Sequence, residues 1–208
     1  ILPEIFISIS IMFLLLFGVF KKESSKLTFN LSLFVLLITT ITTINETFSI
    51  SRVTMFNGSV IIDYMSSLMK IITLICGFLV LVISSSYLKI FKLFNIEYPI
   101  LILSSILGMM IMISSNDLIV FYMGLELQSL GLYVLATYNR DQIKSSEAGL
   151  KYFVLSALSS GLLLYGCSLI YGFSGSTNFD IISSQLNSNE YVLGINGDCE
   201  LFGLSMSD

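Results

Sequence analysis

Residues 118–138 read LIVFYMGLELQSLGLYVLATY and form an apolar stretch long enough to cross a membrane, with Glu126 near its centre. A charged side chain at that depth costs about 2.5–3.5 kcal/mol on insertion scales. Such a residue therefore usually faces the inside of a helix bundle and takes part in moving a proton or an ion. On a helix, Tyr122, Ser129 and Tyr133 share one face with Glu126.

Beside that face runs a second strip of small or polar residues, formed by Gly124, Gln128 and Gly131. We expect both strips to be buried against other helices, since small residues allow close packing and polar side chains hydrogen-bond across helices. The alternative for Glu126 is a structural ion pair that only fixes helix positions. The desolvation cost of a buried charge favours a role in proton transfer.

The composition of the whole chain agrees with a membrane protein. Its 208 residues are 55% hydrophobic and 12% charged, with a mean hydropathy of +0.90, whereas soluble domains are about 25% charged. The sequence has no His, its three cysteines have no paired spacing, and it has no glycine-rich phosphate-binding motif. A metal site, a disulfide framework and nucleotide binding are therefore not expected.

Successive apolar runs predict an all-α polytopic transmembrane bundle of about six helices, over residues 5–20, 29–44, 64–88, 99–113, 118–138 and 150–171. Pro99 suits a first helical position, and Asn116 and Asp117 suit an N-cap. Gly172 and Gly175 suit the end of the sixth helix. We expect residues 1–173 to form the bundle and residues 174–208, which are mostly polar, to form a C-terminal tail with one apolar stub at residues 201–204.

Basic residues fall in alternate loops. The loops after the first, third and fifth expected helices are basic, and the opposite side of the membrane carries Arg52; the bases of the first group are Lys21, Lys22, Lys26, Lys89, Lys92, Arg140 and Lys144. Basic loops stay on the side of insertion. The N-terminus and the C-terminal tail are therefore expected on the side away from the matrix or cytoplasm.

Two lysines join Glu126 as candidates. Lys151 follows Glu147 by four residues, the favourable order for a helical ion pair, and its alternative role is that of a lysine that extends to the lipid headgroups. Lys70 lies roughly two turns into the third expected helix, at a depth comparable to that of Glu126, so the two could face each other. A surface pair of Lys70 with Asp63 is the alternative.

Small residues also predict a helix-packing face on the sixth helix, formed by Ser156, Ala157, Ser159, Ser160 and Gly161.

Three segments resemble a known family: LELQSLGLYVLA at 125–136, SEAGLKYFVLSALSSG at 146–161 and LYGCSLIYG at 164–172. They are similar to subunit 2 of respiratory complex I, the antiporter-like membrane-arm subunit of NADH:ubiquinone oxidoreductase. The resemblance implies that Glu126 is the proton-channel glutamate and that Lys151 belongs to the polar axis. We take Glu126, Lys151 and Lys70, in that order, as the candidates for the proton path.

The resemblance also implies the setting of the chain. No redox cofactor is expected in it, and FMN, iron–sulfur clusters and ubiquinone are expected elsewhere in the complex. The expected partners are the other membrane-arm subunits and the lipid bilayer, with no nucleic acid. Few Ala and Pro with many Ile, Phe, Asn, Lys and Ser suggest an AT-rich genome, and with the resemblance this favours the mitochondrial inner membrane, with the N-terminus on the intermembrane-space side.

The sequence departs from the family in two ways. Gly131 stands where the family usually has Pro, and the chain has fewer helices than the family, without the lysine of the seventh helix. We therefore expect one piece of a split subunit, completed by a second polypeptide. The alternatives are a subunit of a multi-subunit cation/proton antiporter, or a reduced structural subunit needed for assembly only.

Overall fold

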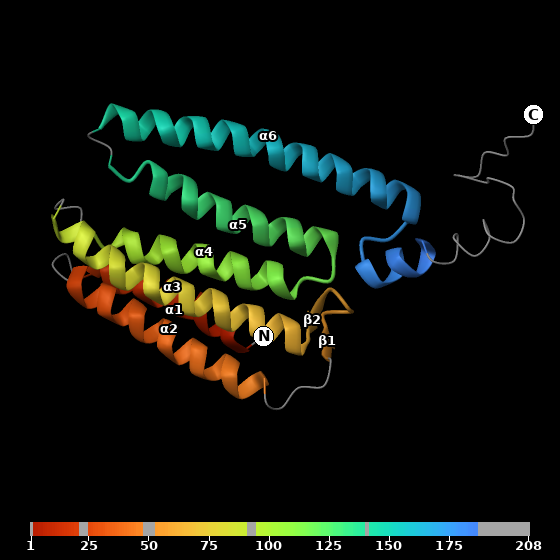
Figure 1. Ribbon diagram of the computed structural model, residues 1–208, viewed down its shortest axis with the longest axis horizontal. Helices are drawn as coiled ribbons and strands as arrows, with labels where there is room; N and C mark the ends of the chain where they lie inside the picture. The colour runs from red at the N-terminus through yellow and green to blue at the C-terminus, as the bar shows by residue number, and fades with distance from the viewer. Residues whose placement is uncertain (1, 21–24, 48–52, 91–94, 140–141, 187–208) are drawn as a thin grey trace, which may run out of the picture.

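The structure is a computed structural model that describes residues 2–20, 25–47, 53–90, 95–139 and 142–186. In Figure 1 its long helices lie side by side, and a small hairpin closes one end of the bundle. The helices are α1 (Leu2–Phe20), α2 (Ser25–Thr47), α3 (Tyr64–Ile90), α4 (Glu97–Ser114), α5 (Leu118–Ala136) and α6 (Ile143–Ser174).

The helical architecture expected from the apolar runs is confirmed. By length and composition, α2 to α6 can each cross a membrane, and α1 is a shorter apolar helix over Leu2–Gly18. The helix ends differ most in α6, which begins seven residues before the expected residue 150. Its 32 residues make a helix about 48 Å long, whereas the hydrocarbon core is about 30 Å thick. The apolar pattern predicted the part of α6 inside the membrane and missed its polar first turns.

The helix caps agree with the sequence in part. Gly175 ends α6 in the left-handed conformation (φ 63°), and its N–H donates to the carbonyl of Tyr171, as expected of a C-terminal glycine. Asp117 occupies the N-cap position of α5, but its side chain makes no capping hydrogen bond. Pro99 is the third residue of α4 and not the first; proline is tolerated there because the N–H groups of the first turn lack helical partners.

The core of the described part of the chain forms around α4, which packs against α1, α2, α3 and α5. Leu103, Ile106 and Met110 of α4 are almost completely buried, together with Leu74 of α3 and Ile7 of α1. In the most apolar 18-residue stretch of α4, 56% of the residues are buried, whereas in that of α6 the share is 0%. Apolar side chains on the surface of α6 are suited to contact with lipid or with further helices.

The backbones of α4 and α5 approach closely at three glycines. A Cβ atom added at Gly108 would lie 2.6 Å from the backbone N of Gln128, and one added at Gly124 would lie 2.8 Å from the backbone N of Met112. A Cβ added at Gly131 would lie 3.2 Å from the carbonyl of Leu101. Glycine at position 131 therefore serves the packing of α5 on α4.

The sequence pattern did not predict the β-hairpin between α2 and α3. Strands β1 (Val53–Met55) and β2 (Val60–Ile62) pair antiparallel, with Thr54 opposite Ile61. The turn between them has positive φ at Phe56, Asn57 and Gly58, and an Asn-Gly pair between β-branched residues is a hairpin signal. We call the end of the bundle that holds this hairpin the hairpin end, and the opposite end, where α5 connects to α6, the loop end.

The polar tail expected at 174–208 begins within the described residues. After Gly175 the chain returns toward the hairpin end (Figure 1), and residues 179–186 are helical. The remainder, including Cys199 and the apolar stub at 201–204, lies outside the described residues.

The glycine contact predicts the effect of two matched substitutions. Gly124→Ala should destabilise the chain by about 1–3 kcal/mol, because the new methyl group meets backbone that has no room to move. Gly161→Ala on α6 is the control: a Cβ added there has no neighbour within 4 Å, and alanine favours helix over glycine by up to about 1 kcal/mol. Thermal unfolding in detergent should separate the two, and equal stabilities would contradict this account of the packing.

Candidate functional site on α5 and α6

Glu126 lies near the middle of α5, about 12 Å along the helix from its start at Leu118. It follows Gly124 by two residues, which places it about 200° around the helix from the glycine face that packs on α4. Its side chain is partly buried and, among the residues that the structure describes, makes no hydrogen bond or ion pair. The position of Glu126 on the helix therefore directs its carboxylate away from α4.

The face of α5 that carries Glu126 lies against α6. Tyr133 is 7% exposed, and its hydroxyl donates a hydrogen bond to the hydroxyl of Ser156. Its ring makes edge-to-face contacts with Tyr152 (centroids 5.0 Å apart) and Phe153 (5.6 Å apart). Helical periodicity places Glu126 on the same face of α5 as Tyr133.

At the loop end, α5 and α6 are joined a second time. The hydroxyl of Ser145 donates to the carbonyl of Ala136 at 2.9 Å. Gly149, the buried residue of α6, packs against the side chain of Thr137. These contacts fix the loop end of the α5–α6 pair.

At the hairpin end, Asn116 holds the start of α5. Its side-chain amide donates to the carbonyl of Gly58 at 2.9 Å and to the carboxylate of Asp180 at 3.0 Å. Its backbone N–H donates to Ser59, and its carbonyl accepts from the backbone N–H of Phe179. One buried side chain thus ties together the hairpin, the α4–α5 turn and the segment after α6. The sequence suggested a helix cap for Asn116, and this network was not predicted.

Lys70 pairs with neither Glu126 nor Asp63. Its ammonium group lies 2.5 Å from the carboxylate of Glu4, and both side chains are buried, at 3% and 10% exposure. The expected pairings were wrong because α1 packs in the core beside α3, while α5 lies on the far side of α4 (Figure 1). Glu4 is a charge in the first turn of an apolar helix, and the rule that selected Glu126 could have selected it.

Lys151 forms the predicted ion pair with Glu147, at 2.6 Å. Both side chains are exposed, at 74% and 58%. Lys151 lies about 12 Å from the start of α6 at Ile143, because α6 begins earlier than expected. The structure therefore does not bring Glu126, Lys151 and Lys70 into one cluster.

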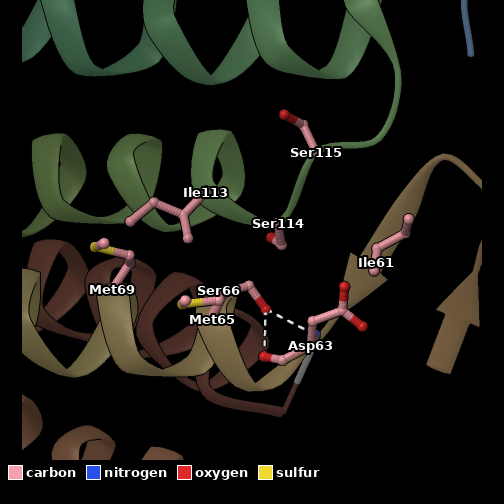
Figure 2. A pocket seen from close by; sticks show the side chains of 8 residues that line it. All are labelled: Ile61, Asp63, Met65, Ser66, Met69, Ile113, Ser114 and Ser115. Atoms are coloured by element: carbon pink, nitrogen blue, oxygen red, sulfur yellow. Dashed lines mark hydrogen bonds between the residues drawn. The ribbon is translucent and has the colours of Figure 1, made fainter. Parts of the chain in front are cut away.

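A pocket of about 330 Å³ opens at the hairpin end, between the start of α3 and the end of α4. Figure 2 shows the hydroxyl of Ser66 bonded to the backbone of Asp63 at one wall of the pocket, with Met69 and Ile113 further along it. Glu126, Lys70 and Lys151 do not line it. The pocket is separate from the candidate proton path.

The buried pair predicts an asymmetry that a double-mutant cycle can measure. Lys70→Met should destabilise the chain by about 3–5 kcal/mol, because it leaves the Glu4 carboxylate buried without its partner. The double variant Glu4→Gln/Lys70→Met should recover part of that loss. Lys151→Met is the control on an exposed pair and should cost less than about 1 kcal/mol. Equal losses for Lys70→Met and Lys151→Met would contradict the buried pairing.

Comparisons with known proteins agree with the fold. A family model described as "NADH:quinone oxidoreductase/Mrp antiporter, TM" matches residues 115–202. NADH-quinone oxidoreductase subunit N of Pelagibacter ubique is 67% identical over 193 residues, covering 93% of this chain and 41% of that protein. The subunit N of Bartonella bacilliformis is 51% identical over 199 residues, covering 94% and 40%.

Among solved structures, a chain of respiratory complex I from Thermus thermophilus with bound aureothin superposes with a TM-score of 0.73 and 24% identity, covering 98% of this chain and 41% of that chain. The chain thus spans about 41% of the length of the curated relatives it matches. The resemblance to an antiporter-like subunit of complex I is confirmed, although the relatives are named subunit N and not subunit 2. The chain is thus similar over 93–94% of its length to NADH-quinone oxidoreductase subunit N of two bacteria, and it has an antiporter-like membrane fold.

Proposed function

We propose that this chain is part of the proton-translocating membrane subunit of a respiratory NADH:quinone oxidoreductase. The observation that carries the proposal is Glu126: a carboxylate at mid-membrane depth that faces α6 and, among the described residues, has no ion-pair partner. A carboxylate can bind and release a proton, and an ionisable residue at this depth usually belongs to a proton or ion pathway.

Lys151 and Lys70 have different places in this proposal. The Glu147–Lys151 pair is exposed on α6, so a further helix that packs there can compete with Glu147 for the lysine. Lys70 is held in a buried pair with Glu4, and its charge is available to a proton path only if that pair opens. The order of the candidates stays Glu126, Lys151, Lys70.

Further helices are part of the proposal. The outward face of α6 carries Gly161, where an added Cβ would meet no atom within 4 Å, and a small residue of this kind lets another helix approach closely. We propose that a second polypeptide supplies helices that cover this face, and that other membrane-arm subunits adjoin the bundle. FMN, iron–sulfur clusters and the quinone belong to other parts of that complex, which supply the electron transfer.

The membrane in question is an energy-transducing inner membrane. The AT-rich coding bias is the basis for a mitochondrial location, and AT-rich genomes also occur among bacteria. The relatives described above are bacterial, so we propose a bacterial inner membrane. The alternating basic loops support an orientation with the loop end toward the cytoplasm and the hairpin end outside.

Two other functions compete with this one. The matching family model also covers Mrp antiporters, so a cation/proton antiporter subunit that works without electron transfer is the first. The second is a reduced structural subunit needed for assembly only.

Glu126→Gln separates these functions when it is made in the native membrane. The variant complex is first isolated and assayed for NADH oxidation; co-purification with that activity is expected here and excludes the antiporter. Proton translocation in vesicles should then fall several-fold at unchanged subunit content, because glutamine cannot exchange a proton.

The matched control is Glu97→Gln, the same chemical change at an exposed residue in the first turn of α4, which should translocate protons at the normal rate. Normal translocation by the Glu126 variant in an intact complex would refute the proposal and leave the structural role.

A further inference from the structure

The hydroxyl pair between α5 and α6 lies on the route from Glu126 to the loop end of the bundle. Tyr133 follows Glu126 by seven residues on the same face of α5, about 10 Å nearer to the loop end. Its hydroxyl donates to Ser156 of α6. Tyr133 lies about one turn from the end of α5 at Ala136, and Ser156 lies about one and a half turns from Lys151. The pair thus stands between the mid-membrane carboxylate and the basic end of the bundle.

Hydroxyl groups continue toward Glu126 along the contact between α5 and α6, which we call the seam. Because α5 and α6 run antiparallel, one turn from the Tyr133–Ser156 contact toward the hairpin end brings Ser129 of α5 level with Ser160 of α6. Ser129 is 8% exposed, and its hydroxyl donates to the backbone carbonyl of Glu126 at 2.9 Å. Hydroxyl groups therefore occur at two successive turns of the seam, and water is needed to bridge the gaps between them.

Ser156 differs from the serines that follow it on α6 and make hydrogen bonds. Ser160, Ser168 and Ser174 each donate to a carbonyl of α6 itself. Ser156 instead accepts from Tyr133, and within the part of the chain that the structure describes its own proton has no acceptor. A hydroxyl that accepts one hydrogen bond and keeps a proton to donate has the arrangement that a proton relay requires.

The aromatic surroundings hold the pair in place. Tyr152 and Phe153 meet the ring of Tyr133 edge to face, with interplanar angles of 84° and 85°. They cover the ring and leave its hydroxyl directed at Ser156. A buried Tyr hydroxyl needs a hydrogen-bond partner whatever its function. The alternative to a proton relay is therefore a structural hydrogen bond that only holds α5 against α6.

We propose that Tyr133 and Ser156 are proton-relay residues that connect Glu126 with the loop end through water in the α5–α6 seam. In the relay each hydroxyl accepts a proton from one neighbour and releases its own proton to the next, so neither residue changes its charge. The proton that leaves water at one end converts the Glu126 carboxylate to the carboxylic acid at the other. This inference rests on the proposed function, and it names the residues that supply protons to the site.

The test uses the assembled complex in vesicles. Tyr133→Phe keeps the ring and its aromatic contacts but removes the hydroxyl, and the rate of proton translocation should fall several-fold. Tyr152→Phe is the matched control, since Tyr152 packs on the same ring and, among the described residues, its hydroxyl makes no hydrogen bond; it should translocate protons normally. Ser156→Ala should lower the rate and Ser156→Thr should restore it, because threonine returns the hydroxyl.

Thermal stability and NADH oxidation with a water-soluble acceptor are measured on every variant. If the pair only locks the helices, Tyr133→Phe and Ser156→Ala lower stability but leave translocation by the intact complex unchanged, and the relay is refuted. Glu126→Gln is assayed in parallel. A loss with Glu126→Gln but not with Tyr133→Phe refutes the relay alone, whereas no loss with Glu126→Gln refutes the proposed function itself.

Discussion

The close contact between α4 and α5 sets the arrangement of the site. At Gly108 and Gly124 the two backbones are so near that a single added carbon atom would overlap main-chain atoms. This contact fixes the rotation of α5 about its own axis, because turning the helix would bring larger side chains against α4. The opposite face of α5, with Glu126 and Tyr133, is thereby directed toward α6. The contact of α5 with α4 thus determines which polar side chains of α5 lie in the seam with α6.

Among the residues that the structure describes, the carboxylates of Glu4 and Glu126 lie in contrasting surroundings. Glu4 is closed off in the core with Lys70 at 2.5 Å, and a buried pair of this kind is costly to open because either charge alone is poorly solvated. Glu126 lies on the loosely covered side of the bundle, beside α6, whose most apolar 18-residue stretch is 0% buried. The first arrangement is suited to holding helices together, and the second to exchanging protons.

Much of this could be predicted from the sequence, and what was missed has physical causes. Apolar runs gave the six helices, and helical periodicity placed Glu126, Ser129 and Tyr133 on one face. Periodicity within a helix cannot say which neighbour that face meets, so Lys70 was paired wrongly. The polar start of α6 was missed because hydropathy reports on contact with lipid, and this segment lies at an end of the bundle. The hairpin was missed although the sequence carries its turn signal, Asn57-Gly58. The network around Asn116 joins residues about sixty positions apart, which no local pattern reveals.

The chemical reactivity of Glu4 and Glu126 tests most directly whether the first is structural and the second exchanges protons. A hydrophobic carbodiimide adds to protonated carboxyl groups within a membrane, and peptide mass spectrometry of treated native membranes locates the adduct, with Glu126→Gln membranes as the control. This account predicts modification of Glu126 and protection of Glu4 by its ion pair with Lys70. Modification of Glu4 with an inert Glu126 would show that the roles of the two carboxylates are reversed.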